Sequence, residues 1–193
     1  LDEIVSSHHR YYARKALKSV QVVTCHDALA GLDEWISLYD VLVERHQIRG
    51  IRAFSRKAFG KQLSTPGIVM FKAVVEGITL GANLFYIHDN IAYTHLSAFS
   101  PRGYDLRVSY AIRWVVMNAL KERVRWRCLG AGSGLNKNGT DGLSKFKAGW
   151  STETRTAYLC GHIFDPDRYS HAVEAKGGKT TDYFPAYREG EFH

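Results

Sequence analysis

Two lysines lie one residue apart, on either side of a phenylalanine, in the stretch GLSKFKAGW at residues 142–150. The stretch follows a glycine-rich loop and has the composition of a short helix. A lysine ammonium is a point charge that reaches a phosphate or an oxyanion without requiring planar geometry. Lys145 and Lys147 therefore either serve such a purpose or lie on a solvated helix face, and their surroundings decide between the two.

A histidine suited to proton transfer lies in the stretch IAYTHLSAF at residues 91–99. Alternation along a strand puts Tyr93, His95 and Ser97 on one face, opposite mostly apolar neighbours. Because imidazole titrates near neutral pH, His95 is the candidate general base for an amine acceptor. The alternative is a packed, hydrogen-bonded strand residue. The other histidines and the three cysteines show no metal-ligand spacing, so we expect no metal site.

The positive charge of the chain is concentrated in one segment. Residues 101–150 hold ten basic and three acidic side chains, which accounts for the whole net charge of +7. We expect an anionic partner, if there is one, to be held here, and the alternative is a basic surface that serves solubility.

The length and composition bound the architecture. At 193 residues and 45% hydrophobic, the chain can bury one sizeable core, and we expect a single domain over 1–193. No apolar run approaches the roughly 18 residues of a membrane span, and no segment has the pattern of a signal peptide. We therefore expect a cytoplasmic protein.

Hydrophobic periodicity predicts the order of the elements. Helices are expected at residues 7–18, 32–46, 55–63, 105–122 and 142–150, and strands at 19–24, 68–75, 78–87, 91–99, 124–130 and 154–164. The tight turns around 78–87 make that strand and its two neighbours antiparallel, and the helix that follows makes the next strand parallel to its predecessor. An edge strand interrupted by Pro185 is a further candidate. The pattern indicates an α/β domain with a mixed, mostly antiparallel central sheet flanked by helices.

Three stretches carry a resemblance to a known family. They are SSHHRYYARKALKSVQVV, AYTHLSAFSPRGYDLRVSYAI, and CLGAGS followed by GLSKFKAGW. Together with the element order, they resemble the GNAT acyltransferases, in particular the Fem-type branch of peptidyl transferases and acetyltransferase-like proteins. The most specific piece is Gly142, Leu143, Phe146 and Lys147. Fem-type proteins often carry two such domains in tandem, so the resemblance allows an upstream second domain.

The resemblance implies where a donor would bind. In this fold the fourth and fifth strands splay apart to admit the acyl donor, and N–H groups at the start of the next helix meet its phosphates. The family's acyl-CoA loop corresponds here to residues 100–105, of which Gly103 matches. Asp105 departs from the pattern, and we expect it to cap its own helix. The residues implied for the donor are Ser97, Ser100, Arg102, Gly103, Tyr104 and Lys145.

The resemblance also implies a reaction. Lys145 replaces the tyrosine that protonates the leaving thiolate in ordinary GNAT enzymes, whereas Lys147 matches the Fem-type lysine and would neutralise a phosphate or the oxyanion. We therefore expect an N-acyltransferase that moves an acyl or aminoacyl group from acyl-CoA or aminoacyl-tRNA to an amine without a covalent enzyme intermediate. The competing interpretation is a GNAT-like binding module that has lost catalysis.

Overall fold

The computed structural model describes residues 1–132, 141–178 and 181–191 of the chain. It forms two compact units. Leu1–Ile48 with Ala53–Thr152 make the first, which we call the sheet unit, and Arg49–Arg52 with Glu153–His193 make the second, the small unit. Every residue that the sequence singled out for chemistry lies in the sheet unit. Whether the chain functions as one domain stays a prediction.

The sheet unit alternates helices and strands in the predicted order. Its elements are α1 (Ser7–Ala16), β1 (Gln21–Cys25), the 3-10 turn η1 (Leu29–Gly31), α2 (Leu32–His46), α3 (Arg56–Leu63), β2 (Ile68–Val75), β3 (Ile78–His88), β4 (Ile91–Phe99), α4 (Pro101–Asp105), α5 (Val108–Leu120), β5 (Trp126–Cys128) and α6 (Gly142–Ala148). The predicted strand at 124–130 is thus shorter than its alternation suggested.

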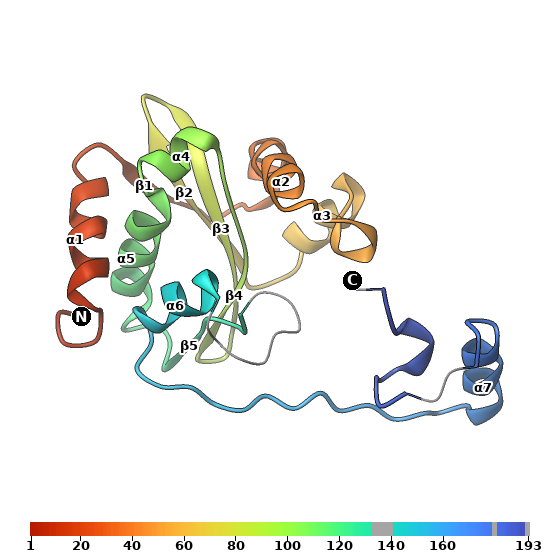
Figure 1. The fold of residues 1–193 in the computed structure, drawn as a ribbon. Coiled ribbons are helices and arrows are strands. Elements are labelled where there is room, and N and C mark those ends of the chain that lie inside the picture. The colour runs from red at the N-terminus through yellow and green to blue at the C-terminus, as the bar shows by residue number, and fades with distance from the viewer. Residues whose placement is uncertain (133–140, 179–180, 192–193) are drawn as a thin grey trace. The chain divides into compact units, whose positions relative to one another are not determined.

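The five strands form one sheet in the order β1-β2-β3-β4-β5 (Figure 1). The first four pair antiparallel, as their short connections require. β5 pairs parallel with β4, because α5 carries the chain back between them. The mixed, mostly antiparallel sheet predicted from the sequence is therefore confirmed.

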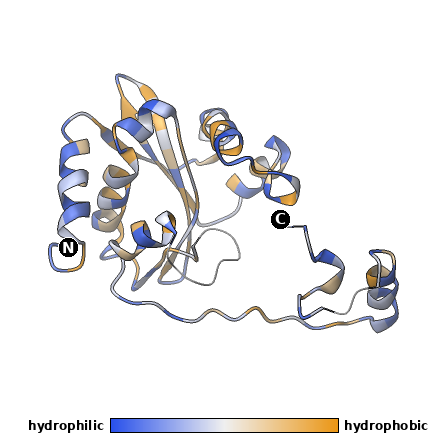
Figure 2. Ribbon diagram, in the orientation of Figure 1, coloured by the Kyte–Doolittle hydropathy of each residue, from blue (hydrophilic) through white to orange (hydrophobic). Residues whose placement is uncertain are grey.

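Helices cover both faces of this sheet. A cluster that includes Phe71, Phe85 and Ile112 packs α5 on one face, and α1 lies alongside α5 (Figure 1). A second cluster, around Trp35 and Phe59, packs α2 and α3 on the other face. Figure 2 shows hydrophobic residues concentrated on the strands and α5, whereas α1 is largely hydrophilic. We call the two sides the α5 face and the α2/α3 face.

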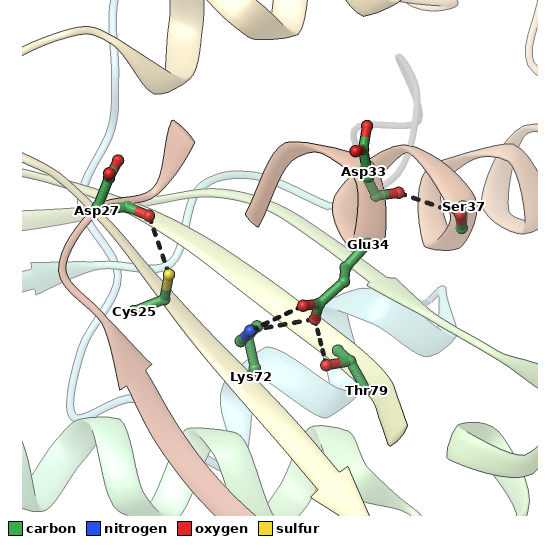
Figure 3. A network of polar contacts seen from close by, with 7 residues as sticks. All are labelled: Cys25, Asp27, Asp33, Glu34, Ser37, Lys72 and Thr79. Atoms are coloured by element: carbon green, nitrogen blue, oxygen red, sulfur yellow. Dashed lines mark hydrogen bonds and ion pairs between the residues drawn. The ribbon is translucent and has the colours of Figure 1, made fainter. Parts of the chain in front are cut away.

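A polar network ties α2 to the sheet. Glu34 in the first turn of α2 accepts hydrogen bonds from Lys72 Nζ, at 3.1 Å to each carboxylate oxygen, and from the hydroxyl of Thr79 (Figure 3). Burial raises the pKa of Glu34, but these hydrogen bonds outweigh it and leave the pKa below its usual value. Nearby, Asp33 O accepts from Ser37 Oγ at 3.0 Å within the same helix. The network orients α2 over β2 and β3.

The long helix expected at 105–122 is broken into α4 and α5. The break lies at Arg107, whose φ of 54° is left-handed and cannot continue a helix. Ser100 is the N-cap of α4, because its hydroxyl accepts from Gly103 N at 3.1 Å. The prediction that Asp105 caps its helix is wrong, since Asp105 is the last residue of α4.

The small unit contains the 3-10 turns η2 (Gly50–Arg52) and η3 (Ala186–Arg188) and the helix α7 (Pro166–Glu174). Asp165 caps α7 by accepting from Arg168 N at 3.0 Å. The strand predicted at 154–164 does not form, because this stretch is exposed and pairs with no strand among the described residues. The edge strand proposed around Pro185 is also wrong, since η3 follows that proline. None of the helices in the described ranges has the length and apolar character of a membrane span.

Candidate functional site

The outer edge of β4 is open over most of its length. β5 pairs only with the first part of β4, from Ile91↔Trp126 to Tyr93↔Cys128. Beyond Tyr93, β4 continues for six residues to Phe99, and no described strand pairs with that side. An open strand edge presents unpaired N–H and C=O groups, which an extended ligand can bind as an added strand. β5 ends at Cys128, so the edge of β4 is open because β5 is short, and the splay of the two strands that the resemblance implied stays a prediction.

A β-bulge in β4 changes which side chains share a face. Asn83 pairs with Ser97 and Phe85 pairs with Thr94, so His95 and Leu96 together face the single residue between them on β3. Leu96 and the buried Ala98 belong to the α2/α3 cluster, whereas the buried Ala92 belongs to the α5 cluster. The predicted alternation therefore holds from Ala92 to His95 and is wrong from Leu96 onward. His95 lies on the α2/α3 face, and Ser97 lies on the α5 face.

His95 is held in a partly buried position. Its Nε2 lies 2.8 Å from Gln62 Oε1 on α3, and its ring centre lies 5.1 Å from that of Tyr86. Because the amide oxygen accepts, Nε2 carries the proton and Nδ1 holds the lone pair. Burial lowers the pKa of His95, so the imidazole is neutral at physiological pH. Its Nδ1 can accept a proton there, as a general base must.

A hollow of about 380 Å³ lies at the end of the open edge. Its lining comes from the last residue of β4 and from the junction of α4 and α5, and consists of Phe99, Gly103, Tyr104, Asp105, Arg107, Ser109 and Tyr110. α5 begins at this hollow and has no side-chain cap at its N-terminus. Uncapped N–H groups and the helix dipole favour an anion at such a position. The Asp105 carboxylate opposes it, whereas the Arg107 guanidinium favours it.

The predicted donor-binding residues divide between this hollow and other contacts. Gly103 and Tyr104 line the hollow. Gly103 has a packing role, because a Cβ at this position would lie 2.2 Å from Leu80 O. Ser100 Oγ donates to the same Leu80 carbonyl at 3.1 Å. Arg102 lies outside the lining and faces Glu76 at 3.7 Å, so the arginine at the hollow is a different one.

That arginine, Arg107, lies 3.8 Å from the centre of the Tyr12 ring on α1. Burial raises the pKa of Tyr110, which also lines the hollow, and the positive charge of Arg107 lowers it in part. The residue whose left-handed backbone breaks the helix therefore also lines the hollow. In the sequence, Arg107 is one of the ten basic residues of 101–150, and no motif assigned it to the donor site.

Helix α6 places its two lysines differently. Lys145 is exposed, whereas Lys147 is half-buried and its Nζ donates to Ala131 O. Burial lowers the pKa of Lys147, and repulsion from Arg113 lowers it further, while Cys128 and Asp141 raise it in part. His95 and Lys147 therefore lie on opposite faces of the sheet, and their predicted catalytic roles stay predictions.

A histidine on α1 anchors α6. His9 is 7% exposed, and its Nε2 lies 3.0 Å from Phe146 O while its Nδ1 lies 2.7 Å from Ser6 Oγ. Burial lowers the pKa of His9, the bond to Phe146 raises it in part, and His8 lowers it. The ring of His9 also packs edge-on against Trp150, with 5.1 Å between centres. This contact fixes the helix that carries Lys147.

Arg113 and Arg127 lie deeper in the protein than the sequence indicated. Arg113 on α5 is 4% exposed, and its Nη1 donates to Thr94 Oγ1 at 3.2 Å. Arg127 on β5 is partly exposed, but its Nη1 is buried, and its Nη2 donates to Trp150 O at 3.3 Å. Both had been counted as part of a basic surface. The available signal was the position of Arg113 next to Ile112 in an otherwise apolar helix.

No family model matches the chain, and no curated protein matches it in sequence. Solved structures do match. An aminoglycoside acetyltransferase from an uncultured soil metagenomic sample, in complex with sisomicin, is 12% identical and superimposes with a TM-score of 0.57 over 77% of this chain and 98% of that chain. The chain adopts the GNAT fold.

Two further structures have this GNAT fold. FemX is 15% identical, with a TM-score of 0.63 over 77% of this chain and 55% of the FemX chain. AAC(6')-Iy, in complex with the bisubstrate analogue CoA-S-monomethyl-acetylneamine, is 14% identical, with a TM-score of 0.51 over 75% of this chain and 99% of that one. The resemblance to the GNAT superfamily is thus confirmed at the level of the fold.

Proposed function

We propose that the protein is an N-acyltransferase that transfers an acyl group from an activated donor to an amine. The observation that carries this proposal is the open outer edge of β4, which leads from the end of the β4–β5 pairing to the hollow at the start of α5. Phe99 belongs to both features, because it ends β4 and lines the hollow. An extended donor with an anionic end therefore has a continuous path.

The donor lies along the β4 edge with its phosphates in the hollow. The amide-containing arm of coenzyme A can exchange hydrogen bonds with the unpaired backbone groups of 94–99, as an added strand does. The N–H groups at the start of α5 and the Arg107 guanidinium then meet the pyrophosphate. Acyl-CoA fits this arrangement, and the neighbour that holds a CoA bisubstrate analogue supports it. The likeness to FemX keeps an aminoacyl ester of tRNA as the second candidate donor.

The reaction is a direct attack by the acceptor amine on the donor carbonyl. The new C–N bond forms as the C–S bond of a thioester, or the C–O bond of an ester, breaks. His95 Nδ1 takes the proton that the amine loses, and Lys147, on the α5 face, neutralises negative charge on a substrate. His95 then releases this proton to solvent. The leaving thiolate or alkoxide takes up a proton from solvent and departs as a neutral thiol or alcohol.

Calorimetric titration with acetyl-CoA and longer acyl-CoAs tests the donor site. Arg107→Ala should weaken acyl-CoA binding by roughly tenfold, because it removes the cation at the hollow. Arg102→Ala is the matched control, since Arg102 faces Glu76 instead. If Arg102→Ala weakens binding and Arg107→Ala does not, the hollow is not the phosphate site. If the wild-type protein binds no acyl-CoA, the acyl-CoA donor is excluded.

Turnover separates an enzyme from a binding module. Release of the CoA thiol is followed in the presence of a panel of amines, with His95→Gln and Lys147→Met beside the wild type. An enzyme loses kcat by roughly 100-fold in His95→Gln, as expected for a general base, while acyl-CoA binding is retained. It also loses turnover in Lys147→Met. Saturable donor binding with no amine-dependent thiol release, across the panel, would favour the non-catalytic module.

A further inference from the structure

Three cations converge on the α5 face where the β4–β5 pairing ends. Arg113 comes from α5, Arg127 from β5 and Lys147 from α6. Arg113 donates to Thr94, the first β4 residue beyond the last β4–β5 pair. Arg127 pairs in register with Ala92, whose side chain belongs to the α5 cluster, so Arg127 lies on the same face. The three side chains are thus brought together by the fold and not by their proximity in the sequence.

The three charges lie close enough to act on one another. Burial lowers the pKa of Arg113 to about 9, with repulsion from Arg127 as the second cause. Burial lowers the pKa of Arg127 to about 10. Repulsion from Arg113 in turn adds to the burial that lowers the pKa of Lys147. Both arginines are protonated at neutral pH, so the protein holds two like charges next to the Lys147 amine in a poorly solvated place.

No carboxylate in the described ranges forms an ion pair with any of the three. Asp141 raises the pKa of Lys147, but its oxygens accept from Leu143 N, Ser144 N and Ser144 Oγ. Residues 133–140, outside the described ranges, contain no Asp or Glu in the sequence. The sequence of 133–140 therefore supplies no acidic side chain to offset the cations.

Not every N–H group of these three side chains has a hydrogen-bond acceptor among the described residues. Within the described part of the chain, Arg127 Nη1 is buried and has no hydrogen-bond partner. Its Nη2 is engaged by a backbone carbonyl, as is Lys147 Nζ. A buried donor without a partner costs free energy, and a buried uncompensated charge costs more. Lys147 and Arg127 are each partly exposed, so a small anion can reach the cluster from solvent.

We propose that Arg113, Arg127 and Lys147 form a binding site for an oxyanion, either a carboxylate or a phosphate, that belongs to one of the substrates. The planar guanidinium groups match two oxygens of such a group, and the lysine adds a third charge. In terms of the proposed function, which this inference deepens, the site lies next to the open β4 edge at Thr94. One substrate, the donor or the acceptor, therefore carries an anionic group close to the reacting acyl group. A substrate without this group should bind more weakly.

The test uses the full chain and two small anions as probes. Thermal unfolding is followed with increasing sodium acetate or inorganic phosphate, each against sodium chloride at the same ionic strength. The midpoint should rise with one or both anions, because binding to the folded state alone stabilises it. The stronger anion identifies the group as a carboxylate or as a phosphate. Equal midpoints in all three salts would overturn the proposal.

Matched variants assign the effect to the cluster. Arg127→Met should weaken anion binding roughly 30-fold or more, because it removes one partner of a buried charged contact. Arg125→Met is the control, since Arg125 lies over the exposed Trp126 ring at 5.6 Å, and it should retain the wild-type response. Lys147→Met, on a different element, is the second variant if Arg127→Met does not fold. A response that survives in Arg127→Met or Lys147→Met would also overturn the proposal.

The outcome is separable from that of the proposed function. Acyl-CoA is titrated into the wild type and Arg127→Met in parallel. If the small anions bind at the cluster but acyl-CoA binds nowhere, the oxyanion site stands and the acyl-CoA donor falls. If acyl-CoA binds but neither anion distinguishes the wild type from Arg127→Met, the oxyanion site falls and the donor site stands.

Discussion

Replacing Arg113 with methionine should make the anion-free protein more stable. Methionine keeps an unbranched stem of similar length and removes the guanidinium from the apolar surroundings of α5. Arg113 is 4% exposed and forms no ion pair with a described carboxylate. The substitution therefore removes a buried charge without leaving a carboxylate partner behind.

The expected gain follows from two opposing terms. A pKa of Arg113 lowered to about 9 means that folding disfavours its charged form by about 5 kcal/mol, at 1.36 kcal/mol per pH unit. The lost hydrogen bond to the Thr94 hydroxyl offsets about 1.5–3 kcal/mol of this. The net gain is about 2 kcal/mol. The penalty applies at pH values below about 9, so it is fully present at pH 7.

Urea unfolding at pH 7 in chloride buffer measures this difference. With a slope of about 2 kcal/mol per molar urea, the midpoint should rise by roughly 1 M in Arg113→Met. Arg123→Met changes an exposed arginine and should leave the free energy of unfolding unchanged within about 0.5 kcal/mol. A loss of stability in Arg113→Met of about 1 kcal/mol or more would show that the guanidinium is well satisfied inside the protein, and the reasoning above would be refuted.

Three further substitutions test the elements around the site. Glu34→Gln should lower the free energy of unfolding by only about 0.5 kcal/mol, because the carboxylate is partly exposed. This difference should vanish as the pH falls through the lowered folded-state pKa of Glu34. Urea unfolding between pH 7 and pH 3 measures it. His9→Gln should cost about 1–2 kcal/mol at pH 7.5. Because the pKa of His9 is lowered, the stability it contributes is present above pH 6.5 and lost as the pH falls, so unfolding at pH 5 should show a smaller difference. Gly103→Ala should lower the free energy of unfolding by about 1–3 kcal/mol, because the added methyl group overpacks against the Leu80 carbonyl. It should also weaken acyl-CoA binding measured by calorimetry. An unchanged affinity would show that Gly103 is not part of the donor site.

Local patterns sufficed for most of the fold. The alternation at 68–75 and 91–99 and the stripe around Trp35 and Tyr39 predicted strands and a helix that the structure confirms, because these side chains pack on the faces that their periods define. Alternation failed at 154–164, since a strand also needs a neighbour to pair with, and pairing is not a local property. It failed again at the bulge in β4, because one extra residue reverses the faces.

The candidate site was only partly predictable for a related reason. Lys147 was found from a motif, and the hollow was expected at the right turn of the chain, but the arginine at that hollow depends on the left-handed backbone of Arg107. Arg113 and Arg127 resembled surface charges, because composition does not report depth. Only the packing of α5 and β5 reveals that Arg113 is buried and that Nη1 of Arg127 is shielded from solvent.

The bulge in β4 makes the strand one residue longer than the sheet requires. Without His95, Thr94 would precede Leu96 directly, and every remaining β4 side chain would keep the face that it has now. A single-codon deletion of His95 should therefore leave both cores intact, whereas deletion of Ala92, in the regularly paired part, would shift the neighbouring side chains to the wrong faces. In evolutionary terms, His95 resembles a one-residue insertion in β4. Such a residue can be gained or lost without changing which side chains pack in the two hydrophobic clusters.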